Sequence, residues 1–344
     1  MRRGTFGSDP YEWTDDTSMA IALAEGLNSL RSSPSAIDET HALKIPDSVL
    51  DKIVNRWYEW SIEAKDVGIQ TGDILRTANR ERGAFGRGIK AEDVLLISKR
   101  YHERNGKSGG NGSLMRTAPL ALFFLPESST SGDAEEATIE SALMEAAFRV
   151  SSVTHWDRDT GEACGIWCIA IRHAVLTGEL DIRRALKRPK LFVYTDATTG
   201  EQVVDDFNKR VALWESRITV AEASRPSAFL RNGWVVEAFQ GAWSAIHHAR
   251  AMPYTSTMIS AQSQGDHPGL NPFRLTLELA IRGGNDTDTV AAIAGGLGGA
   301  VYGADIDFIP QDWREKLYGW PDMKVEDLIK LVDGLVGSPA NLGI

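Results

Sequence analysis

The spacing of apolar side chains constrains this fold more than any other feature of the sequence. Apolar residues recur at intervals of three and four positions over much of the chain, whereas alternating runs of the kind that form strands are scarce. Because this spacing places apolar side chains on one face of a helix, we expect most of the chain to be helix packed on helix. The sequence therefore predicts an all-α fold.

Individual helices follow from the same spacing. They are predicted at Thr17–Leu30, Val49–Ile62, Ala91–Arg100, Ile139–Val150 and Val290–Val301.

Two segments depart from the helical pattern. The polar, acidic stretch Glu127–Glu136 predicts a solvated loop. Between Lys190 and Val204, two β-rich runs flank the sequence ATTG, which is the one place where a small β-hairpin is expected. No repeat of fixed period and no long polar linker divides the chain, so residues 1–344 are predicted to form a single domain.

Charge and cysteine content exclude several classes of protein. With 37 Lys and Arg against 47 Asp and Glu, the net charge is −10 and no basic run offers a nucleic-acid groove. Cys164 and Cys168 lie four apart in an apolar stretch, so we expect them to pack rather than to bridge, as in a reducing compartment. No apolar run reaches the roughly 20 residues that span a bilayer, and residues 1–9 lack the apolar core of a signal peptide. We expect a cytoplasmic protein without a membrane partner.

Two acidic clusters stand near opposite ends of the chain, WTDDT at 13–17 and GGNDTDT at 283–289. Each precedes an apolar helix, so either could simply cap that helix. The repetition favours a second interpretation, in which the clusters bind a metal ion. Oxygen ligands from Asp and Thr suit Mg²⁺ or Mn²⁺ better than Zn²⁺. If the clusters meet, four carboxylates converge, which favours a site for two metal ions.

Two further stretches carry candidate ligand-binding groups. In GGNGSLMR at 109–116, the glycines can present backbone N–H groups to an anion, and Asn, Ser and Arg add donors, although such a segment can also be a plain turn. His155 in VTHWD is a further candidate ligand-binding residue, with a purely structural histidine as the alternative.

Taken together, these motifs resemble the ADP-ribosylglycohydrolase family, which includes the dinitrogenase-reductase-activating glycohydrolase and the ADP-ribosyl-arginine and ADP-ribosyl-serine hydrolases. WTDDT, GNGSLMR, TH, NGWVV and GNDTDT followed by AAIAGGLGGAVYG occur in the family's order over nearly the whole chain. The resemblance implies a compact orthogonal helical bundle with two Mg²⁺ or Mn²⁺ ions. It also implies hydrolysis of the bond between ADP-ribose and an acceptor, on an ADP-ribosylated protein or small molecule, and we expect a monomer.

The resemblance assigns roles to individual residues. The implied metal ligands are Thr14, Asp15 and Asp16 for one ion and Asp286, Asp288 and Thr289 for the other, with Asp288 as the bridge.

Two catalytic residues and a substrate-binding set are implied in the same way. Asp66 in KDVGIQT is similar to an aspartate thought to assist opening of the ribose ring, and Asp288 is assigned beside it; the alternative for Asp66 is an exposed loop acid next to Lys65. Trp234 takes the position that stacks on adenine, unless it belongs to the core. The implied substrate-binding residues are Asn111, Gly112, Ser113, Met115, Arg116, His155 and Trp234.

One departure from the family concerns the N-terminus. Members normally begin with a glycine-rich helix whose glutamate completes the metal site, whereas only twelve residues precede Trp13 here. We expect a start further upstream; alternatively Glu12 or Asp9 compensates, or the metal site is incomplete. The competing functions are a catalytically silent ADP-ribose-binding protein and another two-metal hydrolase such as a phosphatase or pyrophosphatase.

Overall fold

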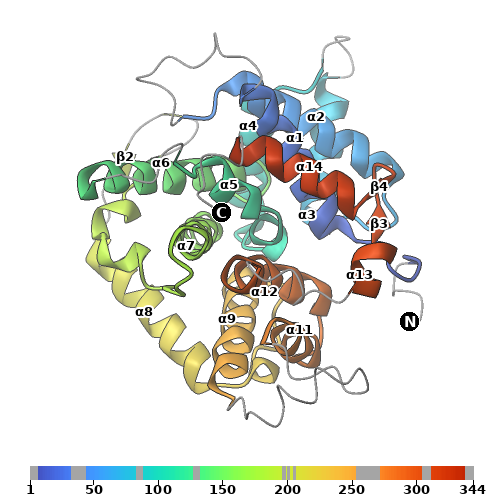
Figure 1. The fold of residues 1–344 in the computed structure, drawn as a ribbon. Coiled ribbons are helices and arrows are strands. Elements are labelled where there is room, and N and C mark those ends of the chain that lie inside the picture. The colour runs from blue at the N-terminus through green and yellow to red at the C-terminus, as the bar shows by residue number, and fades with distance from the viewer. Residues whose placement is uncertain are drawn as a thin grey trace.

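The computed structural model describes most of the chain and is built almost entirely of helices (Figure 1). The described residues are 7–31, 44–82, 88–126, 132–195, 199, 202–203, 207–252, 272–303 and 311–337. The prediction of an all-α fold is confirmed. None of the helices in these ranges is both long and apolar enough to cross a membrane.

The helices follow one another from the N-terminal to the C-terminal side. They are α1 (Asp15–Arg31), α2 (Asp47–Glu63), α3 (Ile69–Arg82), α4 (Ala91–Asn105), α5 (Ala118–Phe123), α6 (Asp133–Ser152), α7 (Arg158–Thr177), α8 (Phe207–Ala223), α9 (Val235–Ala251), α11 (Pro272–Arg282), α12 (Thr287–Tyr302), α13 (Gln311–Lys316) and α14 (Val325–Val336). The short 3₁₀ helix η3 (Asn111–Arg116) precedes α5.

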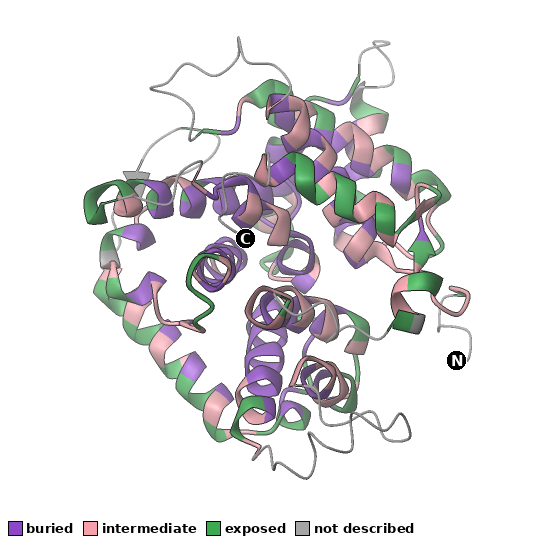
Figure 2. Cartoon of the chain, in the orientation of Figure 1, coloured by how far each residue is buried: buried purple, intermediate pink, exposed green. Residues whose placement is uncertain are grey.

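Helix α7 lies near the centre of the molecule and is buried along most of its length (Figure 2). It packs against α6, α12, α5 and α9. The close approach to α6 depends on Gly161, where an added Cβ would lie 2.3 Å from the ring of Phe148. Cys164 and Cys168 are buried within α7 and unbridged, as the sequence predicted.

Two groups of helices flank α7 and carry the functional motifs. On one side α1 packs against α2 and α14, and the indole of Trp57 in α2 donates to the carbonyl of Met19 in α1 at 2.9 Å. On the other side α12 packs against α9 and α11, and the indole of Trp167 in α7 donates to the carbonyl of Ile293 in α12 at 3.1 Å. Helix α12 is thereby fixed directly to the central helix, whereas α1 is joined to it through η3 and α5, which pack against both α1 and α7.

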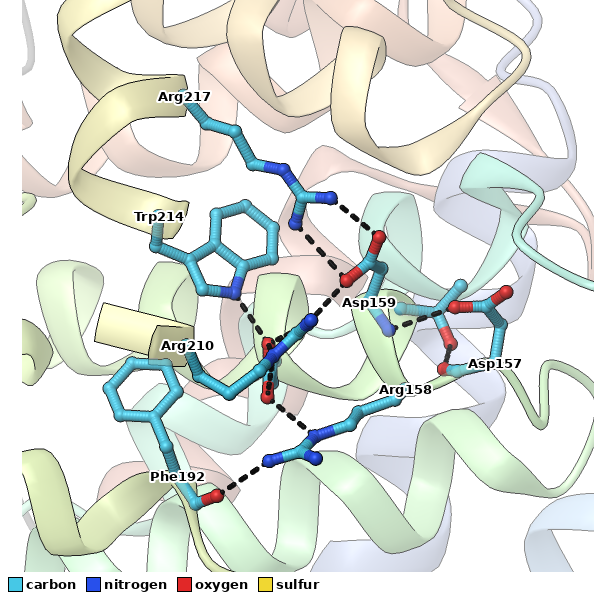
Figure 3. Close-up of polar contacts among 9 residues, drawn as sticks. Asp157, Arg158, Asp159, Phe192, Arg210, Trp214 and Arg217 are labelled. Atoms are coloured by element: carbon cyan, nitrogen blue, oxygen red, sulfur yellow. Dashed lines mark hydrogen bonds and ion pairs between the residues drawn. The ribbon is translucent and has the colours of Figure 1, made fainter. Parts of the chain in front are cut away.

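A buried ion cluster ties α8 to the first turns of α7 (Figure 3). Arg217 donates to Asp159 at 2.7 Å, and Arg210 pairs with both Asp159 and Glu162. The indole of Trp214 donates to Glu162 at 2.6 Å. Burial acts to raise the pKa of Asp159, but the hydrogen bonds and charges of the two arginines hold it below its usual value. Asp159 therefore stays ionised, and its ion pairs with α8 keep the start of α7 in place.

Two small hairpins interrupt the helical pattern. Strand β1 (Tyr194–Thr195) pairs with β2 (Gln202–Val203), which confirms the hairpin predicted between Lys190 and Val204. Strand β3 (Tyr318–Gly319) pairs with β4 (Met323–Lys324) just before α14, and no sequence signal indicated this second hairpin.

The predicted helices all occur, with one error at a boundary. Residues Asp133–Glu136, expected in a loop, form the first turn of α6, because acidic side chains are favourable at the positive end of a helix. Residues 127–131 of that predicted loop lie outside the described residues, as does the serine- and proline-rich segment after α1.

Candidate active site

Most of the predicted site residues line a cavity of about 1100 Å³. The predicted residues outside its lining are Asp16, Ser113, Arg116 and Trp234. One end is formed by the segment before α1, the start of α1 and the turn before α12. The other end is formed by the start of η3 and by His155, and α3 contributes a side wall through Gln70 and Thr71. The fold thus brings together motifs from residues 14–16, 66, 111–115, 155 and 286–289.

The two acidic clusters meet at one end of this cavity, which we call the acid end. Asp15 and Asp16 lie in the first turn of α1, and Asp286 and Asp288 lie at the start of α12. Asp66, from the connection between α2 and α3, lies close enough to interact electrostatically with Asp15, Asp286 and Asp288. Both helix N-termini direct their positive ends at the carboxylates, which partly offsets their mutual repulsion.

The convergence of carboxylates shifts their protonation. Burial, together with the neighbouring acidic charges, raises the pKa of Asp15 to about 8. The pKa of Asp16 rises to about 7, again chiefly through burial, although a hydrogen bond from Thr14 opposes the shift. Burial also raises the pKa of Asp66 and of Asp286. The acid end therefore favours either bound protons or a bound cation.

The acid end presents carboxylate and hydroxyl oxygen atoms, the type of ligand that hard cations prefer. Asp16 is only 3% exposed, and its Oδ1 atom has no hydrogen-bond partner within the part of the chain that the structure describes. An unpaired buried carboxylate oxygen is costly unless a cation or proton satisfies it. As the side chains stand in the described ranges, no three His, Cys, Asp or Glu residues form a coordination shell, so cation binding would require them to close by rotation.

A hydrogen-bond network joins the acidic turn before α12 to the start of η3. The amide of Asn111 donates to Asp286 Oδ2 at 2.7 Å and to the carbonyl of Asn232 at 2.8 Å. Asn232 in turn donates to the carbonyl of Gly284 and accepts from the backbone N–H of Asp286. Gly284 and Asn285 adopt positive φ angles of 84° and 60°, which glycine and asparagine tolerate and which turn Asp286 toward the cavity. Asn111 therefore positions a carboxylate as well as lining the cavity.

Residues 108–112 form a segment that we call the glycine loop. His155 forms the floor of the cavity beneath this loop. Arg116, which can only donate, donates to the Thr154 hydroxyl at 2.8 Å, so that hydroxyl donates its own proton to His155 Nδ1 at 2.8 Å. This arrangement leaves the imidazole proton on Nε2. An added Cβ at Gly110 or Gly112 would lie 3.2 or 3.1 Å from the imidazole ring, so glycine permits the close approach.

The imidazole of His155 is held neutral. Burial and the charge of Arg116 lower its pKa well below the ordinary value. His155 can therefore offer a neutral Nε2–H donor to a ligand lying on the loop.

Gln70 and backbone bonds fix the loop over this floor. The amide of Gln70 donates to the carbonyls of Ser108 and Thr154 at 3.1 and 2.6 Å, which joins the loop to the segment that carries the histidine. The backbone N–H of Asn111 donates to the carbonyl of Gly233 at 3.1 Å.

Two residues predicted to bind substrate lie beneath the loop instead. Because residues 111–116 form the 3₁₀ helix η3, part of its side chains turn into the core. Ser113 is fully buried against Cys164, and Arg116 is fully buried, with its guanidinium 3.9 Å from the ring centre of Trp57 and donating to the carbonyl of Val150. Their side chains support the site from below, in contrast to the direct ligand contacts that the sequence suggested.

The remaining predicted residues border the cavity. Gly112 and Met115 line it, as do Thr14, Asp288 and Thr289. Trp234 stands beside the loop, where its backbone bridges to Gly110 and its ring would meet an added Cβ at Gly109 at 3.3 Å. With 37% of its surface exposed, Trp234 is not a core residue.

The segment before α1 closes the acid end. Glu12 lines the cavity, and its carboxylate is bound by Lys65 Nζ at 2.6 Å, with Asp9 3.7 Å from the same ammonium group. The backbone of Glu12 pairs with that of Tyr318 in β3, so the second hairpin packs against the segment before α1 and supports it (Figure 1). Asn232, Gln70 and this hairpin were not assigned from the sequence. Asn232 lies in the quoted motif NGWVV and Gln70 in KDVGIQT, whereas the hairpin lies in no quoted motif.

Comparison with known proteins decides the family. The ADP-ribosylglycohydrolase family matches residues 1–341. The chain belongs to this family. Human ADP-ribosylhydrolase ARH3 is 25% identical over 94% of this chain and 80% of its own length. ADP-ribosylarginine hydrolase Tri1 of Pseudomonas putida is 26% identical over 91% of this chain, which spans 64% of the length of Tri1.

A solved structure agrees with the family fold. An ADP-ribosylglycohydrolase-related protein complex aligns with 97% of this chain and 84% of its own, with a TM-score of 0.52 and 21% identity. The ordered motifs, the helical fold and the family match therefore agree.

The raised pKa of Asp16 predicts how the stability of the metal-free protein depends on pH. An unfolded Asp ionises near a pKa of about 3.9. In the folded chain the pKa of Asp16 is about 7, so its contribution to folding is fully favourable only below the unfolded pKa and is lost as the pH rises through the folded pKa. We expect the melting temperature of the metal-free protein to fall between about pH 5 and pH 8, and Asp16→Asn to reduce that slope.

The matched control for this test is Asp333→Asn on α14, which should keep the wild-type slope. At the upper pH, Mg²⁺ should raise the melting temperature of the wild type but not that of Asp16→Asn. Identical slopes for the wild type and Asp16→Asn, measured by scanning calorimetry, would contradict this account of the carboxylates.

Proposed function

We propose that this protein hydrolyses the glycosidic bond between ADP-ribose and an acceptor and releases ADP-ribose. The observation that carries the proposal is the convergence of Asp15, Asp286 and Asp288 at one end of a cavity whose other end is a glycine loop over a neutral histidine donor. The buried Asp16 interacts electrostatically with Asp286 and Asp288. Family membership supports the reaction class.

The two ends of the cavity suit the two ends of the substrate. Backbone N–H groups of the glycine loop and the Nε2–H of His155 offer donors to the pyrophosphate and the distal ribose. Trp234, exposed beside this loop, offers a ring on which adenine can stack. With the ADP portion held there, the anomeric carbon would lie at the acid end.

We propose that Thr14, Asp15, Asp16, Asp286, Asp288 and Thr289 hold two Mg²⁺ or Mn²⁺ ions, with Asp288 as the bridge. Such ions, when bound, would activate water and neutralise charge at the reacting centre. The unpaired Oδ1 of Asp16 and the raised pKa values of Asp15 and Asp286 support a cation at this position.

Asp66 is the proposed proton donor. It lines the acid end without belonging to either acidic cluster, and burial with the charges of Asp288 and Asp286 raises its pKa. A carboxyl group whose pKa is raised holds a proton more readily and can pass it to an oxygen of the ribose ring as the ring opens. Neither cysteine reaches the cavity, so the proposed reaction uses no cysteine nucleophile.

The proposal predicts a metal-dependent release of ADP-ribose that depends on Asp66. Wild type should turn over ADP-ribosylated peptide in Mg²⁺ or Mn²⁺ and lose activity in EDTA. Asp66→Asn should lower kcat by about 10²–10⁴-fold, the usual contribution of a general acid, while binding ADP-ribose. The control Asp73→Asn, on the exposed face of α3, should keep wild-type kcat.

The products distinguish the competing functions. Release of AMP or phosphate in place of ADP-ribose would assign a pyrophosphatase or phosphatase. Binding of ADP-ribose by calorimetry with no turnover in either metal would assign a silent binding protein. Either result would overturn the proposed hydrolysis.

The proposed adenine contact gives a separate prediction. Trp234→Ala should weaken ADP-ribose binding by about 1–3 kcal/mol, the range for a base stacked on an aromatic ring, and Trp234→Phe should recover most of it. Leu230→Ala removes a nearby exposed apolar side chain and should leave the affinity unchanged. If Trp234→Ala binds ADP-ribose as tightly as the wild type in calorimetry, the adenine lies elsewhere.

A further inference from the structure

The first turn of α3 forms a side wall of the active-site cavity and carries polar groups that the proposed function does not use. Gln70 and Thr71 both line the cavity. Thr71 is only 3% exposed, and its hydroxyl has no hydrogen-bond partner within the part of the chain that the structure describes. A buried hydroxyl without a partner costs free energy unless a ligand or water satisfies it. This wall therefore offers polar contacts to a bound molecule.

The carboxamide of Gln70 has a fixed orientation. Its Nε2 atom donates to the carbonyls of Ser108 and Thr154 at 3.1 and 2.6 Å, which uses both amide protons. The reverse orientation would place Oε1 against two carbonyl oxygens. Oε1 accepts no hydrogen bond from the described residues. Gln70 therefore presents a free acceptor to the cavity in a direction that the protein sets.

This acceptor and the imidazole proton of His155 flank the same residue of the glycine loop. An added Cβ at Gly110 would lie 3.8 Å from Gln70 Oε1 and 3.2 Å from His155 Nε2. His155 is 2% exposed, and its hydrogen bond with Thr154 engages only Nδ1, so Nε2–H has no partner among the described residues. The cavity thus presents one donor and one acceptor side by side next to Gly110.

The chemistry of these two groups selects what can bind between them. Ionised pyrophosphate oxygens only accept hydrogen bonds, so they can pair with the Nε2–H of His155 but not with Oε1 of Gln70. A hydroxyl both accepts and donates, so a single hydroxyl can satisfy both residues. In ADP-ribose, such hydroxyl groups lie on the two riboses.

We infer that Gln70 is a substrate-binding residue that recognises a ribose hydroxyl of ADP-ribose together with His155. This inference rests on the hydrolase function proposed above and adds a specificity determinant to its binding site. The hydroxyl accepts from Nε2–H and donates to Oε1, while the backbone N–H groups of the glycine loop serve the pyrophosphate. A ligand that lacks the hydroxyl leaves both protein groups unpaired, and such a loss discriminates strongly between similar ligands.

Three ligands separate the possible sources of the hydroxyl. ADP-ribose carries both riboses, ADP lacks the distal ribose, and 2′,3′-dideoxy-ADP also lacks the hydroxyls of the adenosine ribose. The dissociation constant of each ligand is measured by calorimetry at one Mg²⁺ concentration for the wild type and for Gln70→Met, which removes the acceptor and keeps the length of the side chain. The control Asp73→Asn, on the exposed face of α3, should bind all three ligands as the wild type does.

The inference predicts a loss of affinity that depends on the ligand. If the hydroxyl belongs to the distal ribose, Gln70→Met should weaken binding of ADP-ribose about tenfold more than binding of ADP. If it belongs to the adenosine ribose, the variant should weaken ADP-ribose and ADP alike, and about tenfold more than 2′,3′-dideoxy-ADP. Equal changes for all three ligands, or no change, would overturn the inference, because a residue that only fixes the glycine loop affects them equally.

A second variant keeps the test decisive if Gln70→Met does not fold. In Gln70→Glu a carboxylate oxygen can still accept from the hydroxyl, whereas both donors to the backbone carbonyls are lost. Binding of all three ligands should weaken, and the wild-type order of their dissociation constants should remain. Equal dissociation constants for the three ligands in this variant would show that the donors to the loop, rather than the acceptor, set the preference, and would overturn the inference.

The binding experiment needs no turnover, so its failure is distinct from failure of the proposed hydrolysis. If an ADP-ribosylated peptide releases ADP-ribose but Gln70→Met changes all three affinities equally, the role of Gln70 is wrong and the hydrolase function stands. If the ligand-dependent loss occurs but no ADP-ribosylated peptide is hydrolysed, the role of Gln70 stands and the hydrolase function is wrong.

Discussion

Electrostatic repulsion among carboxylates is the constraint around which this structure is built. The first turns of α1 and α12 bring together acidic side chains from opposite ends of the chain, and Asp66 adds a further charge. Such a cluster opposes folding unless protons or cations neutralise it. Burial, and after it the neighbouring acidic charges, raises the pKa values of Asp15 and Asp16, and one oxygen of Asp16 has no hydrogen-bond partner in the described part of the chain.

Hydrogen bonds elsewhere in the site keep its side chains in place against that repulsion. Asn111 and Asn232 tie Asp286 to the glycine loop, so the carboxylate and the loop are fixed as a unit. On the opposite side, Arg116 fixes the proton of His155 through Thr154. Because these groups are buried and held by hydrogen bonds, a ligand would meet donors whose directions are set before it arrives. These hydrogen bonds fix the non-helical segments that carry much of the site.

Sequence patterns predicted the convergence of Asp16 and Asp288, because both lie in acidic clusters at the start of apolar helices and the motifs follow a family order. They did not indicate that the side chains of Ser113 and Arg116 are buried, because a glycine-rich stretch does not reveal that residues 111–116 wind into a 3₁₀ helix that turns part of its side chains into the core. The second hairpin, β3–β4, was not predicted. Residues 318–324 contain no motif, and the hairpin gains its role only through the backbone pairing of Tyr318 with Glu12, which lies far away in the sequence.

The central claim is that the starts of α1 and α12 form one cation site. Anomalous diffraction from crystals soaked in Mn²⁺ tests it most directly, because the metal is located without reference to turnover. The account predicts anomalous density between the carboxylates of Asp16 and Asp288, with both side chains rotated to meet it. Density that lies elsewhere, or none at that position when Mn²⁺ saturates the protein in solution, would contradict it.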